Sequence, residues 1–169
     1  MVTSGGQIEI SDIHEVNFGL KDKPLEVDSA TNLYGAGSNL TFKNIDNFNS
    51  FTNASAGIMV QADSTLSYDN VKNIYIANEY AGTSGSIRSA VQLFCNSDGT
   101  AVKPASFSIT NAETVELSGT ISDTNTAALG AGIVVNDRGG VYSGSKSANL
   151  LIQAKTISVY GSDLGIFFD

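Results

Sequence analysis

Five aspartates are the side chains that most resemble a chemical site in this sequence. Each follows shortly after a short apolar segment: Asp28, Asp63, Asp98, Asp137 and Asp169. Carboxylates gathered along one edge could bind a metal ion or act as acid and base on a polysaccharide, and Arg138 would supply a cation for a lyase. Their offsets from the apolar segments differ, however, and aspartate is a common turn residue because it bonds its own backbone. Turn residues are therefore the favoured interpretation, and a catalytic cluster is the alternative.

Histidine and cysteine give little support for other chemistry. His14 is the only histidine, and we expect it to be an exposed surface residue in a polar column. Cys95 is the only cysteine, so an internal disulfide is impossible, and we expect a small buried apolar side chain. The sequence has no metal-ligand spacing of Cys and His and no Ser/His/Asp arrangement around His14. It therefore predicts no metal site and no cofactor.

Two long polar links are better candidates for binding, because loops carry binding disproportionately when a rigid scaffold holds them. We expect Ala77–Ala90 and Ser118–Ala131 to leave the same corner of the fold in consecutive copies of a repeat, and so to lie side by side. The candidate binding residues in these links are Glu79, Tyr80, Arg88 and Asp123. Tyr80 is the best contact residue, since an exposed aromatic can act as a rigid anchor. Insertions without a role are the alternative, and we expect Tyr75 and Tyr160 to cover the outer strand surface.

A repeat that occurs five times must position these residues. Its anchor is a small apolar residue after a polar kink: Ile13, Ile45, Val71, Ala112 and Ala154. Three residues before the anchors stand Ile10, Phe42, Tyr68, Ile109 and Leu151. Three residues after them stand Val16, Phe48, Ile74, Val115 and Ile157. The kink residues are Asp12, Asn44, Asn70, Asn111 and Gln153. An internal repeat of this kind predicts stacked units that bury their apolar faces against one another.

Each copy also predicts a third apolar strand: Leu25–Val27, Ile58–Val60, Val91–Leu93, Ile133–Val135 and Ile166–Phe168. Glycine precedes three of them, and we expect it to permit a sharp corner. The link between first and second strands keeps its length, whereas the other two links vary, and extra loop length costs little. The sequence has neither hairpin signals nor helical periodicity. It therefore predicts an all-β fold, a right-handed single-stranded parallel β-helix of about five three-strand coils.

Smaller features of the repeat predict local structure. The kink residues could form an amide ladder in which each side chain bonds the backbone of the next coil. Ser50 stands where other copies have an apolar residue, with Phe51 one position later, so we expect a local bulge. In the last copy Asn149 replaces an apolar residue, which predicts a bulge or a changed register there.

The net charge of the chain argues against two classes of binding partner. The chain has 169 residues and a formal net charge of -8, which argues against nucleic acid and against an anionic membrane surface. No stretch is long enough to cross a bilayer, so we expect no membrane insertion. The N-terminal residues MVTSGGQ carry no export signal. We expect residues 1–169 to form one β-helix segment of a longer protein.

The coil pattern resembles a known family. The segments SFSITNAETVELSG at 106–119 and LIQAKTISVYGSDLGI at 151–166 resemble the passenger-domain coils of bacterial autotransporter adhesins. The resemblance implies a β-helix displayed outside the cell at the bacterial surface, and a non-catalytic adhesin that binds a host glycan, a host protein or a like molecule on another cell. A carbohydrate-active β-helix enzyme, such as a polysaccharide lyase or hydrolase, and a purely structural stalk are the alternatives. Open strand edges also predict end-to-end self-association.

Overall fold

In a computed structural model, the described residues of the protein form two parallel sheets. The structure describes residues 2–3, 5–26, 30–34, 37–80, 87–94, 104–121, 129–136 and 148–168. The five-stranded sheet, in the order β10-β8-β6-β4-β2, comprises β2 (Gln7–Phe18), β4 (Asn39–Thr52), β6 (Thr65–Tyr80), β8 (Ala105–Ile121) and β10 (Ala148–Gly161). The six-stranded sheet, in the order β1-β3-β5-β7-β9-β11, comprises β1 (Val2–Thr3), β3 (Thr31–Tyr34), β5 (Ala56–Val60), β7 (Ile87–Phe94), β9 (Leu129–Asn136) and β11 (Leu164–Phe168). The chain alternates between the sheets, and the named strands pair in parallel. The predicted all-β class is confirmed.

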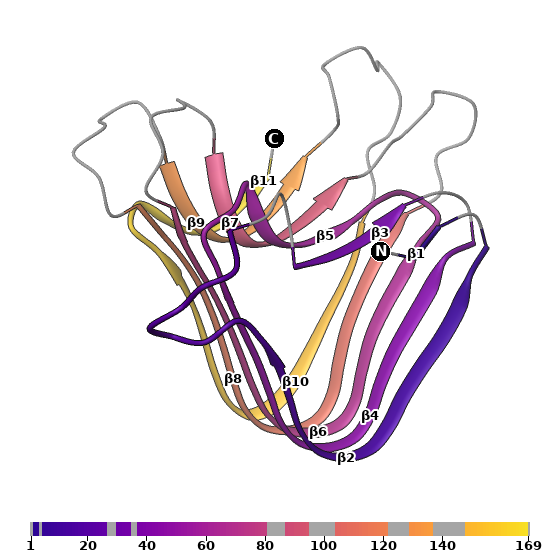
Figure 1. Ribbon diagram of the computed structural model, residues 1–169. Coiled ribbons are helices and arrows are strands. Elements are labelled where there is room, and N and C mark those ends of the chain that lie inside the picture. The colour runs from indigo at the N-terminus through magenta and orange to yellow at the C-terminus, as the bar shows by residue number, and fades with distance from the viewer. Residues whose placement is uncertain are drawn as a thin grey trace.

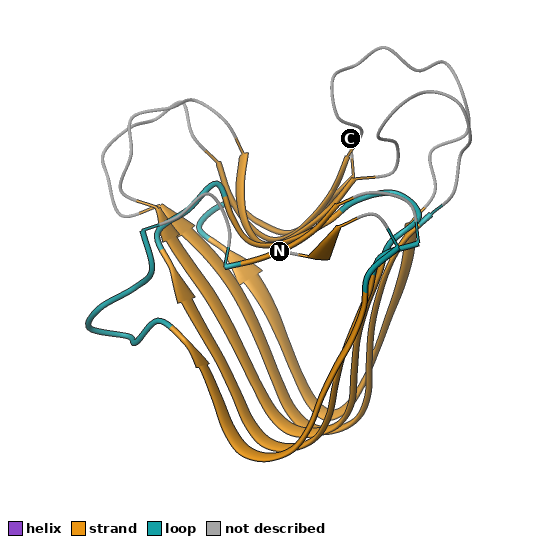
Figure 2. Cartoon of the chain, turned by 45° about the vertical axis from the view of Figure 1, so that its right-hand side comes forward, coloured by secondary structure: helices purple, strands orange, loops and turns teal. Residues whose placement is uncertain are grey.

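The long strands are bent, and the short strands lie across the open end between their two arms (Figure 1). Figure 1 shows the five-stranded sheet folded into a V, with the six-stranded sheet across its open end. The turned view in Figure 2 shows the same arrangement. Buried apolar side chains from both sheets fill the interior as one cluster. Within the described residues there is no helix with the length and apolar character needed to cross a membrane.

The bend of four long strands, β2, β4, β6 and β8, is a single residue in the left-handed conformation. The φ angles are 59° at Asp12, 54° at Asn44, 55° at Asn70 and 57° at Asn111. Asn and Asp tolerate this conformation better than other residues with a side chain, which explains their place in the repeat. Pairing continues on both sides of the bend, so the predicted first and second strands are one bent strand rather than two separate strands.

The two predicted apolar ladders of the repeat are confirmed for the central strands. Phe42 pairs with Tyr68 and Tyr68 with Ile109, while Phe48 pairs with Ile74. All are buried. The Phe42 and Tyr68 rings stack with centroids 5.1 Å apart, and the Phe48 ring lies 4.7 Å from that of Phe42. Such aromatic pairs contribute about 1 kcal/mol each beyond their buried area, so the stack is strongest at β4 and β6.

The third-strand ladder is confirmed except in the first copy. Ile58 pairs with Val91, Val91 with Ile133 and Ile133 with Ile166. Of the first predicted member, Leu25–Val27, residue 27 lies outside the described residues, and Leu25 does not join the six-stranded sheet. Leu25 forms an isolated bridge with Thr52 at the end of β4, and β3 supplies the six-stranded sheet instead. Leu33 of β3 is fully buried and pairs with both Val2 and Val60, so burial selected β3 over the earlier apolar pair.

Ser50 forms no bulge, contrary to the prediction. It pairs in register with Phe18 on one side and Ile76 on the other, and it is buried. The Phe18 ring reaches Phe48 at 5.7 Å between centroids and supplies the apolar contact at this level. A small polar side chain is therefore accommodated without breaking the strand.

The last copy changes register, as predicted, but this displaces one assigned ladder residue. Ile152 pairs with Ile109 and Ala154 with Ala112, with a register shift between them. Leu151 pairs with Ser108 and is 46% exposed, so its placement in the apolar ladder was wrong. The copy is one residue shorter at the bend, and Gln153 does not adopt the left-handed conformation of the other kink residues.

Two of the glycines before the third strands, Gly57 and Gly132, serve close approach rather than unusual backbone angles. None of Gly57, Gly132 and Gly165 has a positive φ. A Cβ at Gly57 would lie 2.7 Å from the carbonyl oxygen of Ala90, and one at Gly132 would lie 2.9 Å from that of Gly165. Glycine is needed there because adjacent backbones leave no room for a side chain.

Candidate functional site

The described ends of the two long links lie side by side, as the repeat predicts. Where the links leave the five-stranded sheet, Glu79 pairs with Thr120 and Tyr80 with Ile121. Where the chain enters the six-stranded sheet, Arg88 of β7 pairs with Gly130 of β9. The predicted site residue Asp123 lies outside the described residues, as do 81–86 and 122–128.

Tyr80 and Arg88 hold each other at the base of the first link. The Arg88 Nη2 donates a hydrogen bond to the Tyr80 hydroxyl at 3.2 Å, and the guanidinium carbon lies 4.1 Å from the centre of the Tyr80 ring. Arg88 is only 8% exposed. A partly desolvated cation–π contact contributes about 1 kcal/mol or more. The pair therefore fixes the two ends of the link, and a binding role for either residue stays a prediction.

A hollow of about 150 Å³ lies on the outer face of the five-stranded sheet, beside the link ends. We call it the aromatic groove; it is lined by Lys21, Pro24, Phe51, Thr52, Tyr75, Ala77, Glu79, Ser118, Thr120 and Tyr160. One row of paired residues crosses it, from Phe51 through Ala77 and Ser118 to Tyr160. The two small side chains stand between two aromatic ones, which makes the hollow. Of the predicted site residues, Glu79 lines it.

Tyrosines and a glutamate shape one side of the aromatic groove. The Tyr75 ring lies 5.1 Å from that of Phe51, and the Tyr160 hydroxyl donates to Glu116 Oε1 at 2.7 Å. The hydrogen bond to Glu116 raises the pKa of Tyr160 above its ordinary value. Burial, and then the charge of Glu116, raises the pKa of Tyr75. Both phenols therefore remain neutral hydrogen-bonding groups at neutral pH.

The sequence carried a signal for the aromatic groove that the prediction missed. Phe51, Ala77, Ser118 and Tyr160 each stand six residues after their anchor. The bend keeps a constant length in the first four copies, so residues at the same offset from their anchors stand in one row. Tyr160 also joins this row, because it pairs with Ser118. Tyr75 and Tyr160 face outward, as predicted. They cover the outer strand surface and also line the aromatic groove.

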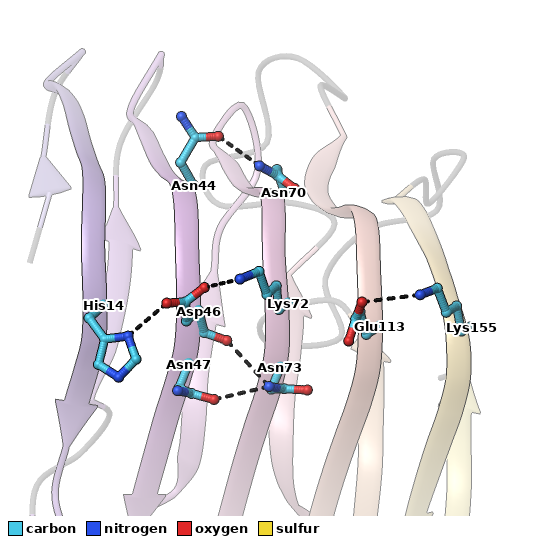
Figure 3. A network of polar contacts seen from close by, with 9 residues as sticks. All are labelled: His14, Asn44, Asp46, Asn47, Asn70, Lys72, Asn73, Glu113 and Lys155. Carbon is cyan, nitrogen blue, oxygen red and sulfur yellow. Dashed lines mark hydrogen bonds and ion pairs between the residues drawn. The ribbon is translucent and has the colours of Figure 1, made fainter.

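A row of exposed charges follows the bend of the long strands (Figure 3). His14 Nδ1 lies 2.7 Å from Asp46 Oδ2, Lys72 pairs with the other oxygen of Asp46, and Lys155 Nζ lies 3.1 Å from Glu113 Oε1. The His14 side chain is 80% exposed, which confirms the predicted surface position. Exposed pairs of this kind contribute little to stability, and the row has the character of a solvated edge.

The predicted amide ladder runs beside these charges, but it joins side chains to one another. Asn44 Nδ2 donates to Asp12 Oδ1 at 2.9 Å, and Asn70 Nδ2 donates to Asn44 Oδ1 at 2.9 Å. Asn111 donates instead to Asp69, at 3.2 Å. The expected bonds to the backbone of the next coil were wrong, because these amides donate to side-chain oxygens of the preceding long strand instead. Asp12 accepts at the end of the ladder and so caps it.

The aspartates considered for catalysis are represented by one described residue, Asp63. It has a φ of 60°, and its backbone N–H bonds the carbonyl of Pro104 at 3.2 Å. This is a turn conformation, in line with the favoured interpretation. Asp28, Asp98, Asp137 and Asp169, with Arg138 and Cys95, lie outside the described residues. Within the part of the chain that the structure describes, no three His, Cys, Asp or Glu side chains gather to hold a metal ion.

Comparison with known proteins identifies no relative for this chain. No family model matches it, and no curated protein or solved structure matches it either.

Proposed function

We propose that this chain is a right-handed parallel β-helix segment of a bacterial surface adhesin, and that it acts as a non-catalytic scaffold for adhesion. The alternation of the chain between two parallel sheets supports the β-helix. Connections between parallel strands of one sheet are right-handed in about 98% of cases, which supports the handedness. The autotransporter-like segments 106–119 and 151–166 support display outside the cell.

One observation carries the adhesive role. The two long links leave the scaffold at paired positions, Glu79 with Thr120 and Tyr80 with Ile121, next to the aromatic groove. Rigid sheets that hold two neighbouring links beside a hollow are suited to binding a partner, because little order is lost on contact. The partner would be a host glycan, a host surface protein or a like molecule on another cell.

End-to-end contact between copies is a second part of this proposal. β10 and β11, at one end of the stack, leave four large apolar side chains exposed: Leu151, Ile157, Ile166 and Phe168. β10 and β11 are also edge strands in their sheets. An exposed edge with apolar side chains favours pairing with another chain. We therefore expect association that strengthens with concentration.

The adhesive role is tested by coating beads with the purified chain and counting their attachment to cultured host cells. We expect attachment well above that of albumin-coated beads, and a fall of about tenfold when short Gly-Ser links replace residues 81–86 and 122–128. His14→Ala, on the distant row of charges, is the matched control and should attach like wild type. Attachment no better than albumin would leave the stalk as the better interpretation.

The enzymatic alternative is tested with the same protein. Uronic-acid polymers are incubated with it, with and without calcium, and new unsaturated or reducing ends are measured. The adhesin proposal expects none. Turnover that disappears in Asp137→Ala would replace it with a polysaccharide lyase or hydrolase.

A further inference from the structure

We propose that the aromatic groove binds one neutral pyranose ring of a glycan. This deepens the proposed function, because it assigns the adhesive contact to named side chains and to one class of ligand. The groove also supports the inference on its own geometry, so the two proposals can fail separately.

The size of the groove suits a single six-membered ring. Its volume is about 150 Å³, and an apolar cavity of about that volume in another protein holds one benzene molecule. Phe51 and Tyr160 lie on β4 and β10, three strand spacings apart, which corresponds to about 14 Å between their backbones. Ala77 and Ser118 occupy the two strands between them and leave the floor low. One ring can therefore lie between the aromatic walls.

The lining is both apolar and polar, as a sugar requires. Phe51, Tyr75 and Tyr160 offer ring surfaces against which the C–H face of a pyranose can pack. Hydroxyl groups come from Ser118 and Thr120 on β8. An apolar hollow with a few convergent polar groups is the usual form of a small-molecule site. A pyranose presents the same combination, an apolar face and a rim of hydroxyls.

Charge selects a neutral sugar over an acidic one. The carboxylate of Glu79 lines the groove and that of Glu116 bonds the Tyr160 hydroxyl at its side, whereas Lys21 is the cation of the lining. The whole chain has a net charge of -8. A uronate or sialate would meet like charge at close range, which is unfavourable in a partly desolvated site. Glu79 can instead accept strong hydrogen bonds from sugar hydroxyls.

A proline-rich peptide is the other ligand that aromatic surfaces receive. Such a peptide is an extended helix with several residues in contact and needs a long groove. The hollow here is ring-sized, and the polar residues Glu79, Ser118 and Thr120 are part of its lining. These features favour the sugar, and the peptide becomes an outcome of the test.

The test measures binding of the purified full chain to soluble ligands by saturation-transfer NMR and titration calorimetry. The probes are methyl glucoside, methyl galactoside, methyl mannoside and methyl N-acetylglucosaminide, with methyl glucuronide and a proline-rich peptide as contrasts. We expect one or more neutral glycosides to bind. Tyr160→Ala removes a wall and Ala77→Leu fills the floor, so each should weaken that binding by about tenfold or more. His14→Ala, on the row of exposed charges and outside the groove lining, is the matched control and should bind like wild type.

Several outcomes would overturn the inference. These are no binding of any neutral glycoside, tighter binding of the glucuronide or the peptide, or binding that survives in both groove variants. Thermal unfolding shows whether each variant is folded, and two variants that change the groove in opposite ways guard against loss of fold in one. Bead attachment separates the proposals. Glycoside binding without bead attachment supports the groove as a sugar site and rejects the adhesin. Attachment that persists in Tyr160→Ala supports the adhesin and rejects the groove as the adhesive contact.

Discussion

The long strands are constrained very differently at their bend and at the end where the links leave. At the bend, which we call the polar corner, Asn44 and Asn70 adopt the same left-handed conformation and their amides bond one another. At the opposite end, the link corner, β8 meets β9 through backbone contact at Gly119 and Ala131. The polar corner keeps a constant length through the first four copies, whereas the links at the other corner vary.

The difference separates two tasks. The polar corner sets the register between successive strands, because backbone conformation and a side-chain ladder both repeat there. The link corner only has to bring the two sheets together, and the chain beyond that contact can vary at little cost. The candidate binding features, the link ends and the aromatic groove, all lie toward the link corner. Length variation and the candidate binding features therefore lie away from the corner that sets the register.

The largest expected effect comes from adding a side chain at the link corner. A Cβ at Gly119 would lie 1.9 Å from the carbonyl oxygen of Ala131, a backbone atom that cannot turn away. We expect Gly119→Ala to lower the free energy of unfolding by about 3 kcal/mol, as in severe overpacking. Gly165→Ala is the control, since its Cβ would come no closer than 3.2 Å to Val159 O. Urea unfolding measures both, and equal losses would contradict the close-contact explanation.

A smaller effect is expected at the polar corner. Asn70→Ala places an unfavourable residue at a φ of 55° and removes the hydrogen bond to Asn44. Together these should cost about 2 kcal/mol of unfolding free energy. Asn70→Gly keeps the backbone conformation accessible and should cost about 1 kcal/mol less. Gln153→Ala, at a bend without the left-handed conformation, should be nearly neutral in the same unfolding experiment. A loss at Gln153 that matched the loss at Asn70 would count against the role of the conformation.

The smallest effect concerns the exposed charges beside the polar corner. The hydrogen bond from Lys72, and then that from His14, holds the pKa of Asp46 below its ordinary value of 3.8. Because the folded pKa is lowered, this stabilisation is fully present above pH 3.8 and is lost as the pH falls through the folded value. Wild type should therefore lose its stability advantage over Asp46→Asn in that acidic window. Melting temperatures from pH 7 to pH 2 measure this, and a difference independent of pH would contradict the contribution of the ion pair.

Local pattern was sufficient to predict much of the fold. Phe42, Tyr68 and Ile109 fall in one ladder because the bend fixes their offset from the anchor, and a fixed offset in the chain becomes a fixed row in the sheet. The same constant offset predicted that the ends of the two long links lie side by side. Tyr160 and Phe51 stand in one row for the same reason, although this row lies outside the apolar columns of the repeat.

Other features depended on contacts that no short segment contains. Leu25–Val27 and Thr31–Tyr34 both suit a strand, and only burial of Leu33 between Val2 and Val60 decides between them. Ser50 looked like a defect in the pattern, yet Phe18 from the preceding long strand packs on Phe48 at that level. In each case the deciding partner is supplied by another copy of the repeat.

The sequence by itself determined the all-β class, the repeat and the rows of residues, because these depend on side-chain type at constant spacing along the chain. Only the tertiary structure decided that each pair of predicted strands is one bent strand, which residues close the first and last copies, and that Phe51 and Tyr160 enclose a hollow. Those features depend on how close separate strands approach, which is set by the packing of the whole stack.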